Sequence, residues 1–159
     1  MVIAIAAIFS LNACNHTCEK VPEKVKTAFS EKFPDAQKVN WEQEEENEWE
    51  AEFKMDDKEY SANFTSDGIW KETEYEIEKS DLPKVVMTTL ETEFAGYNID
   101  EVEISEIPEG KFYEVEIVND DDEIEVTLTP DGRIVEKEIK KEEEHHDNDE
   151  GEHHDNDDD

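Results

Sequence analysis

Apolar and polar residues follow two different periods along the centre of the chain. In residues 21–33 and 82–94 the apolar positions recur every three or four residues, the spacing of one helical face. Pro22 and Pro83 stand where these two segments begin, and proline is favoured at a helix start. The segments that follow alternate between apolar and charged residues with period two, which predicts β-strands with one dry and one solvated face.

Each predicted helix precedes four such alternating segments, so we expect a helix followed by an antiparallel meander, twice. The alternation is clearest in EWEAEF, residues 48–53, and in YEVEI, residues 113–117. We expect the helices to cover the dry face, which gives a two-layer α+β sandwich with an eight-stranded sheet. The strand residues predicted to lie beneath the helices include Trp41, Trp49, Phe53, Tyr113 and Ile117.

The middle of the chain is a self-repeat. Residues 48–72 align with residues 112–136 without a gap, at an offset of 64, and each copy contains an Asp-Gly turn. Self-similarity at a fixed period indicates a duplicated structural unit. We therefore expect a tandem duplication, with one repeat at 21–80 and the second at 81–139.

The order of these features resembles a known family. A helix introduced by Val21-Pro22 or Leu82-Pro83, an acidic meander, an Asp-Gly turn and a tandem copy are similar to the PepSY-like, β-lactamase-inhibitor-like lipoproteins of Bacteroidota-type bacteria. The resemblance covers about residues 21–139. It implies an eight-stranded antiparallel sheet with helices on one side, a free second side and a secreted or periplasmic setting. No shared catalytic residue is implied.

Charge excludes one class of partner. The chain has 48 acidic and 15 basic residues among 159, a formal net charge of -33. Such a field repels nucleic acids and anionic membrane surfaces and attracts cations and basic protein surfaces. We expect a protein or peptide partner, for which the charge favours a basic one, and no nucleic acid. The sequence leaves the oligomeric state open.

The residue inventory argues against an enzyme. The five histidines and two cysteines all lie outside residues 21–139, and no phosphate loop or nucleophile elbow is present. The strand glutamates are expected to be solvated, with ordinary acidity. We therefore expect a non-enzymatic binding module without a cofactor.

Glutamates on the predicted solvated face form the candidate partner site, and a nearby tryptophan is a candidate member. The residues are Glu50, Glu52, Trp70, Glu114 and Glu116. The alternative is that the charges only keep the sheet soluble and prevent edge pairing. The side of Trp70 depends on the turn before it. A two-residue type I′ turn puts the indole on the glutamate face, whereas a type I turn with a glycine bulge turns it toward the core.

The N-terminus resembles a bacterial lipoprotein signal. Residues 2–9 are apolar but too few to span a membrane, and Leu11-Asn12-Ala13-Cys14 resembles a lipobox. We expect residues 1–13 to be a signal peptide, Cys14 to be lipidated and residues 14–20 to be a tether. The protein would then be a periplasmic or cell-surface lipoprotein of the outer membrane. Ordinary signal cleavage near Ala13, or a disulfide between Cys14 and Cys18, are the alternatives.

Residues 140–159 are predicted to be a disordered tail. From residue 142 onward the tail holds eleven acidic residues and no lysine or arginine. Imidazoles and carboxylates bind divalent cations, so weak metal binding is expected. The candidate ligands are His145, His146, Asp147, His153, His154 and Asp155. The alternative function is therefore a protein that binds or sequesters divalent cations through its acidic face and tail.

Overall fold

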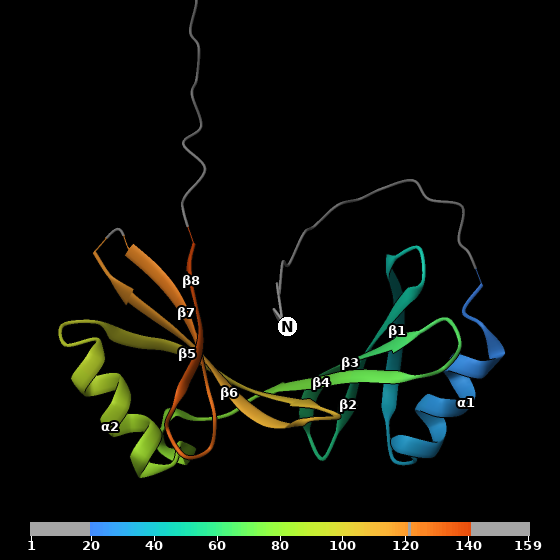
Figure 1. Cartoon of the computed structure of the whole chain (residues 1–159). Helices are drawn as coiled ribbons and strands as arrows, with labels where there is room; N and C mark the ends of the chain where they lie inside the picture. The colour runs from blue at the N-terminus through green and yellow to red at the C-terminus, as the bar shows by residue number, and fades with distance from the viewer. Residues whose placement is uncertain (1–19, 121, 141–159) are drawn as a thin grey trace, which may run out of the picture. The chain divides into compact units, whose positions relative to one another are not determined.

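The computed structural model describes residues 20–120 and 122–140. Two α-helices and eight β-strands follow one another in the order of a helix, four strands, a short 3-10 segment, a helix and four strands (Figure 1). The elements are α1 (Glu23–Lys32), β1 (Gln37–Glu45), β2 (Glu48–Met55), β3 (Lys58–Thr65), β4 (Trp70–Glu76), η1 (Lys79–Asp81), α2 (Lys84–Glu93), β5 (Asn98–Ile107), β6 (Gly110–Asn119), β7 (Asp122–Leu128) and β8 (Ile134–Lys140).

The strands form one antiparallel sheet in the order β1-β2-β3-β4-β5-β6-β7-β8, so the spatial order is the sequence order. The predicted α+β class and eight-stranded antiparallel sheet are therefore confirmed. The chain divides into two compact units, which we call unit 1 (residues 1–72) and unit 2 (residues 73–159). Strand β4 contributes its first three residues to unit 1 and its remainder to unit 2.

Proline begins both helices in the same way. The carbonyl of Pro22 accepts hydrogen bonds from the backbone N–H groups of Val25 and Lys26, at 3.1 and 3.2 Å. The carbonyl of Pro83 accepts one from Met87 at 3.1 Å. Proline has no N–H to lose at this position and its fixed φ suits the first helical turn, so the sequence predicted the starts correctly.

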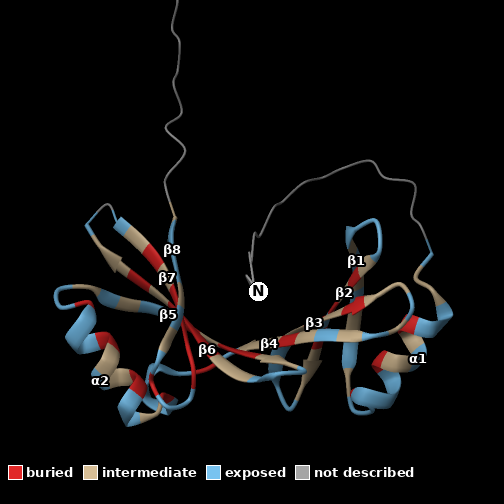
Figure 2. Cartoon of the chain, viewed as in Figure 1, coloured by how far each residue is buried: buried red, intermediate tan, exposed pale blue. Residues whose placement is uncertain are grey.

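The core of unit 1 is aromatic. The ring of Phe29 on α1 lies 5.0 Å from that of Phe53 and 5.2 Å from that of Trp41, both edge-on. Trp49 is 4% exposed, and its indole N–H donates to Ser66 Oγ at 3.2 Å. The buried cluster consists of Val25, Phe29, Phe33, Trp49, Ala51, Phe53, Ala62 and Phe64 (Figure 2). These strand residues occupy the apolar phase that the alternation predicted.

Unit 2 has an aliphatic core in the equivalent place. Val86 and Leu90 on α2 pack with residues of β5, β6 and β7, of which Val115 and Val126 are fully buried. Its buried members are Ile77, Leu82, Val86, Leu90, Phe94, Val102, Ile104, Tyr113, Val115, Ile117, Ile124, Val126 and Leu128. Tyr113 and Ile117 thus lie in the predicted core phase.

Two turns with the same hydrogen bonds connect the last strands of each set. Gly68 donates its N–H to Thr65 O at 2.7 Å, and Gly132 donates to Thr129 O at 2.8 Å. Their φ angles are +82° and +81°, the left-handed region in which glycine has no steric penalty. Both turns are type I turns followed by a glycine bulge.

Each of these turns also touches the helix of its unit. A Cβ atom on Gly68 would lie 2.7 Å from the carbonyl oxygen of Lys24, and one on Gly132 would lie 2.9 Å from Val85 Cγ2. Thr89 Oγ1 on α2 donates to Gly132 O at 2.8 Å. The Asp-Gly turns therefore fix the position of each helix start as well as reversing the chain.

Candidate functional site

Glutamates stand opposite one another across the strands of unit 2. The pairings Glu101↔Glu116, Glu116↔Glu125 and Glu125↔Glu138 join β5, β6, β7 and β8 into one continuous row. An adjacent row contains Glu76, Glu103 and Glu114. We call Glu101, Glu103, Glu114, Glu116, Glu125 and Glu138 the glutamate face of unit 2. Like charges directly opposite each other in a sheet repel, so this face costs stability.

The repulsion and partial burial change the acidity of the face. Burial, with the negative charges of Glu101 and Glu125, raises the pKa of Glu103 to about 7. Burial, followed by the charge of Glu76, raises the pKa of Glu101. The pKa of Glu125 is also raised, mainly by burial. The expectation of ordinary acidity was wrong for these groups, because side chains in adjacent strands exclude water from one another as well as repelling.

One ammonium group lies among these carboxylates. Lys140 Nζ donates to Glu116 Oε2 at 2.7 Å and lies 3.4 Å from Glu125 Oε2 and 3.5 Å from Glu123 Oε1. Lys140 reaches from the end of β8 past β7 to β6. In the described parts of β5 to β8, it is the one basic residue in register with the glutamate rows.

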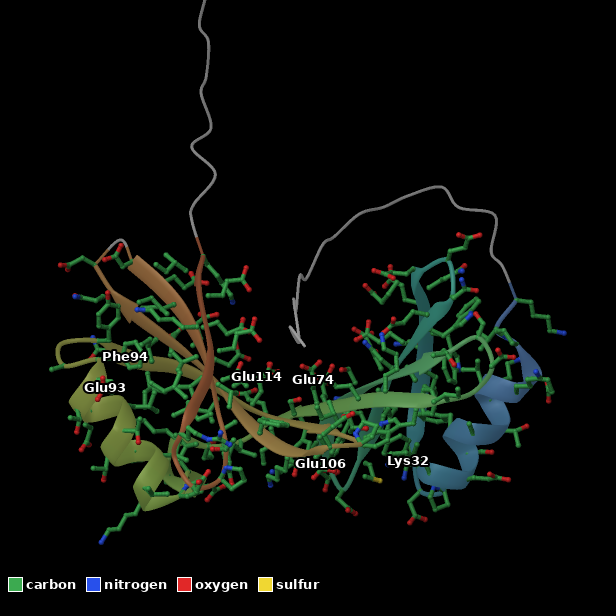
Figure 3. All side chains as sticks on the ribbon, in the orientation of Figure 1. Lys32, Glu74, Glu93, Phe94, Glu106 and Glu114 are labelled. Carbon is green, nitrogen blue, oxygen red and sulfur yellow. The ribbon has the colours of Figure 1, made fainter. Side chains whose placement is uncertain are left out.

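Glu114 departs from its predicted environment. It was expected on the solvated side of β6, where Figure 3 labels it. The structure leaves it only 4% exposed. Strand β6 has a neighbour on each side, and Glu114 pairs with Glu103 on β5 and Thr127 on β7. One of its carboxylate oxygens lies within 4.8 Å of one of Glu74. Glu116, half-buried and in register with the main row, is the more accessible of the two predicted β6 residues.

Two of the predicted glutamates, Glu50 and Glu52, lie on β2 of unit 1. Glu50 pairs with Glu42 on β1 and Asn63 on β3, and Glu52 pairs with Asn40 and Ser61. Glu50 is half-buried and Glu52 is exposed. Burial, together with the neighbouring Glu44 and Glu52, raises the pKa of Glu50 to about 7.

The acidic surface of unit 1 is partly neutralised by lysines. Lys54 forms an ion pair with Glu59, and Lys71 forms one with Glu48. Ion pairs of this kind contribute little to the stability of a fold, but they reduce the local field. In the described strands the longest row of glutamates in register is the one on the glutamate face of unit 2, where Lys140 pairs with Glu116 and Glu125.

Trp70 lies on the core side of its strand. The N–H of Thr65 donates to Ile69 O at 2.9 Å, which is the pairing of a three-residue loop with a glycine bulge. Trp70 packs against the buried cluster of unit 1, and the ammonium of Lys32 stands 3.5 Å above its ring. The turn thus selects the second of the two alternatives, and Trp70 does not join the glutamates.

Comparison with known protein families identifies the family of the chain. The model of the family described as "Putative beta-lactamase-inhibitor-like, PepSY-like" matches residues 14–59 and 47–136. The chain belongs to this PepSY-like family. The resemblance inferred from the helix, meander and turn pattern is therefore confirmed. No curated protein shows significant sequence similarity to the chain.

Solved structures share the fold of this PepSY-like chain. A DUF2874 family protein from Bacteroides uniformis has a TM-score of 0.70 and 20% identity, covering 76% of this chain and 90% of its own. A BLIP-like protein from Bacteroides fragilis has a TM-score of 0.69 and 21% identity, covering 77% and 89%. A "putative periplasmic" protein from Bacteroides eggerthii has a TM-score of 0.69 and 19% identity, covering 76% and 90%.

Several predicted sites lie outside the described residues. They are the lipidation residue Cys14 and the tail residues His145, His146, Asp147, His153, His154 and Asp155. Within the described part of this PepSY-like chain, no helix is long and apolar enough to cross a membrane.

Sequence reasoning missed part of the site. Glu101, Glu103 and Lys140 were not among the predicted partner residues. The signal for Glu103 was present, since it alternates with the core residues Val102 and Ile104. Lys140 had no local signal, because its role depends on the register of three strands.

Proposed function

We propose that this PepSY-like protein is a non-enzymatic, lipid-anchored module of the cell envelope that recognises or inhibits a protein or peptide through the free face of its sheet. The observation that carries the proposal is the row Glu101–Glu116–Glu125–Glu138, in register across β5 to β8. We assign the contact to the glutamate face of unit 2.

The energetics of this face favour a basic partner. Its carboxylates repel one another, and their raised pKa values record the cost of keeping them ionised. A cationic group placed among them lowers that cost, so the partner relieves repulsion that the free protein retains. Electrostatic complementarity also accelerates association and excludes acidic partners.

A raised glutamate pKa is also found in enzymes, so catalysis is the competing interpretation. Here burial and like-charged neighbours along a row of paired strands account for the shift in Glu103. Residues 20–140 contain neither histidine nor cysteine, the side chains most used as base and nucleophile. The membership in an inhibitor-like family further favours binding over catalysis.

The proposed architecture is a tandem duplication, with repeats at 21–80 and 81–139. Its support is the pair of equivalent turns at Gly68 and Gly132, each in contact with the helix of its own unit. The family model also matches the chain twice, at residues 14–59 and 47–136, which supports a repeated unit. In this arrangement the helices cover one side of the sheet and leave the glutamate-bearing side for a partner.

The proposed location is the periplasm or cell surface, with an outer-membrane lipid anchor at Cys14. The lipobox-like Leu11-Asn12-Ala13-Cys14 supports it, as does the periplasmic description of the Bacteroides eggerthii structure. Replacing Cys14 with alanine should release the protein from washed membranes into the soluble fraction. A Cys14→Ala protein that stays in the membrane at the same level would contradict the anchor.

Binding or sequestration of divalent cations through the acidic face and the tail is the alternative function. It relies on tail residues such as His145 and Asp147, and in the described part of the chain carboxylate oxygens of Glu74 and Glu114 lie within 4.8 Å of each other. Zinc titration of the full chain and of a chain lacking residues 142–159 separates the two functions, because deletion should abolish metal binding and spare protein binding.

The principal test compares two triple variants as bait in envelope extracts. Glu101→Gln/Glu116→Gln/Glu125→Gln removes three of the six charges of the glutamate face, whereas Glu91→Gln/Glu93→Gln/Glu109→Gln removes the same charge from exposed positions on α2 and a turn. A specific partner should be captured by the parent and the control but lost by the face variant. Equal capture by all three proteins would refute this face as the contact surface.

A further inference from the structure

The terminal ammonium group of Lys140 occupies a defined position on the glutamate face. Its nearest carboxylate oxygen, Glu116 Oε2, is 2.7 Å away on β6, and Glu123 and Glu125 on β7 lie within 3.5 Å. The three carboxylates come from two strands, and Lys140 comes from a third. The Lys140 side chain is 36% exposed, so this position remains reachable from solvent.

The surroundings favour the charged form of Lys140. Burial lowers its pKa, but the hydrogen bond with Glu116 and the charges of Glu116, Glu125 and Glu123 outweigh burial, and the pKa is raised. An ammonium group has three N–H donors pointing in different directions, which matches three carboxylates arranged around one point. A guanidinium group is planar and pairs best with a single carboxylate through two parallel bonds.

We propose that Lys140 occupies the position that a lysine of the partner takes on binding. The Lys140 ammonium must then leave the carboxylates of Glu116, Glu123 and Glu125 before the partner's ammonium can enter. Lys140 is thus an autoinhibitory contact on the binding face. This inference rests on the proposed function, and it adds the partner's chemistry, a lysine-bearing protein segment, and a residue that limits its affinity.

The chain offers a matched control for removing Lys140. Lys137 lies in the same strand, carries the same charge and belongs to the opposite phase, where its ammonium stands 5.2 Å from the Phe94 ring. Lys140→Met and Lys137→Met therefore change the net charge equally, and only the first opens the position among the carboxylates.

The test measures binding of a labelled peptide in which lysine alternates with threonine, by fluorescence anisotropy with the full chain. Lys140→Met should bind this peptide about fivefold more tightly than the parent, while Lys137→Met should stay within about twofold. An otherwise identical arginine peptide should gain less from Lys140→Met. Adding Glu116→Gln to Lys140→Met should reverse the gain.

A second measurement uses the unaltered protein. The rate at which an amine-acylating reagent modifies Lys140 should increase when the lysine peptide saturates the protein, because the peptide displaces the Lys140 ammonium. The rate at Lys137 should not increase. An ordinary peptide contact over Lys140 would slow its acylation instead.

The outcomes distinguish a failure of the proposed function from a failure of the autoinhibitory contact alone. If neither the parent nor Lys140→Met binds the lysine peptide, the basic-partner function and this inference both fail. If the parent binds but Lys140→Met binds no better than Lys137→Met, or if the peptide protects Lys140 from acylation, the autoinhibitory contact is refuted and the proposed function stands.

Discussion

Glu50 shows how one residue in a sheet acquires unusual acidity. Its carboxylate is half-buried on β2 and close to Glu44 and Glu52, and its pKa rises from an ordinary value of 4.5 to about 7. Protonation therefore favours the folded state. The stabilising contribution of protonated Glu50 is complete below about pH 4.5 and is lost as the pH rises through about 7.

Replacing Glu50 with glutamine, which resembles the protonated carboxyl, should remove this pH dependence. Because solvent screens this half-buried group, the effect is smaller than the full pKa shift implies. We expect Glu50→Gln to raise the free energy of unfolding by about 1–2 kcal/mol at pH 8 and to change it little at pH 5. Urea unfolding followed by tryptophan fluorescence measures this effect, since all three tryptophans lie in unit 1. Glu46→Gln, at an exposed turn, is the control. Equal effects at both pH values would contradict the raised pKa.

Trp49 precedes Glu50 on β2 and points to the opposite, core side of the strand. It is 4% exposed and its indole N–H is bonded to Ser66. Trp49→Ala should lower the free energy of unfolding by about 3–5 kcal/mol, because it leaves a large cavity in a packed core. Ile69→Ala, at a 65% exposed position, should cost far less. Circular dichroism during urea unfolding gives both values, and a loss below about 1 kcal/mol for Trp49→Ala would show that the site is not packed.

At the scale of elements, the Asp-Gly turns were predicted and their contacts with the helices were not. Alternation in the sequence was sufficient to assign the phase of each strand, because one apolar face must be buried. The side occupied by Trp70 could not be assigned, since a turn that is one residue longer reverses it. The environment of Glu103 also depends on residues far along the chain, on β4, β6 and β7.

Substitutions at three glycines test the contacts between turn and helix. Gly68, Gly132 and Gly96 all have positive φ, so alanine should cost about 1–2 kcal/mol at each. At Gly68 the new Cβ would also meet the backbone of Lys24, whereas at Gly96 it would meet nothing within 4 Å. Thermal unfolding should therefore show a greater loss for Gly68→Ala and Gly132→Ala than for Gly96→Ala. Equal losses would mean that the helix starts move away from the turns at little cost.

At the scale of the whole molecule, the raised pKa values of partly buried glutamates move the pH of greatest stability below neutrality. The pKa values of Glu50 and Glu103 are both about 7, so ionising them above neutrality destabilises the fold. Ion pairs with lysine lower the pKa of Glu59 and Asp67. Carboxylates of this second kind contribute stability above their unfolded-state pKa, and they lose it as the pH falls through their lower folded-state pKa.

The thermal midpoint should therefore be highest between about pH 4.5 and 6 and should decrease toward pH 8. Added salt should raise the midpoint at pH 8 more than at pH 5, because it screens the repulsion among ionised carboxylates. Circular dichroism melts across this range make the comparison. A midpoint that increases steadily from pH 5 to pH 8 would show that the glutamate rows do not control stability.

Strand order has a kinetic consequence. Every strand pairs with the strand before or after it in the sequence, and short turns join all of these pairs except β4 and β5, which are connected through η1 and α2. Most of the sheet can therefore form from short loop closures. Topologies of this kind have low contact order and fold quickly for their size. If the chain is exported unfolded, as a lipoprotein would be, each hairpin can close as soon as its second strand emerges. The helix that precedes each set then docks last, on strands that have already paired.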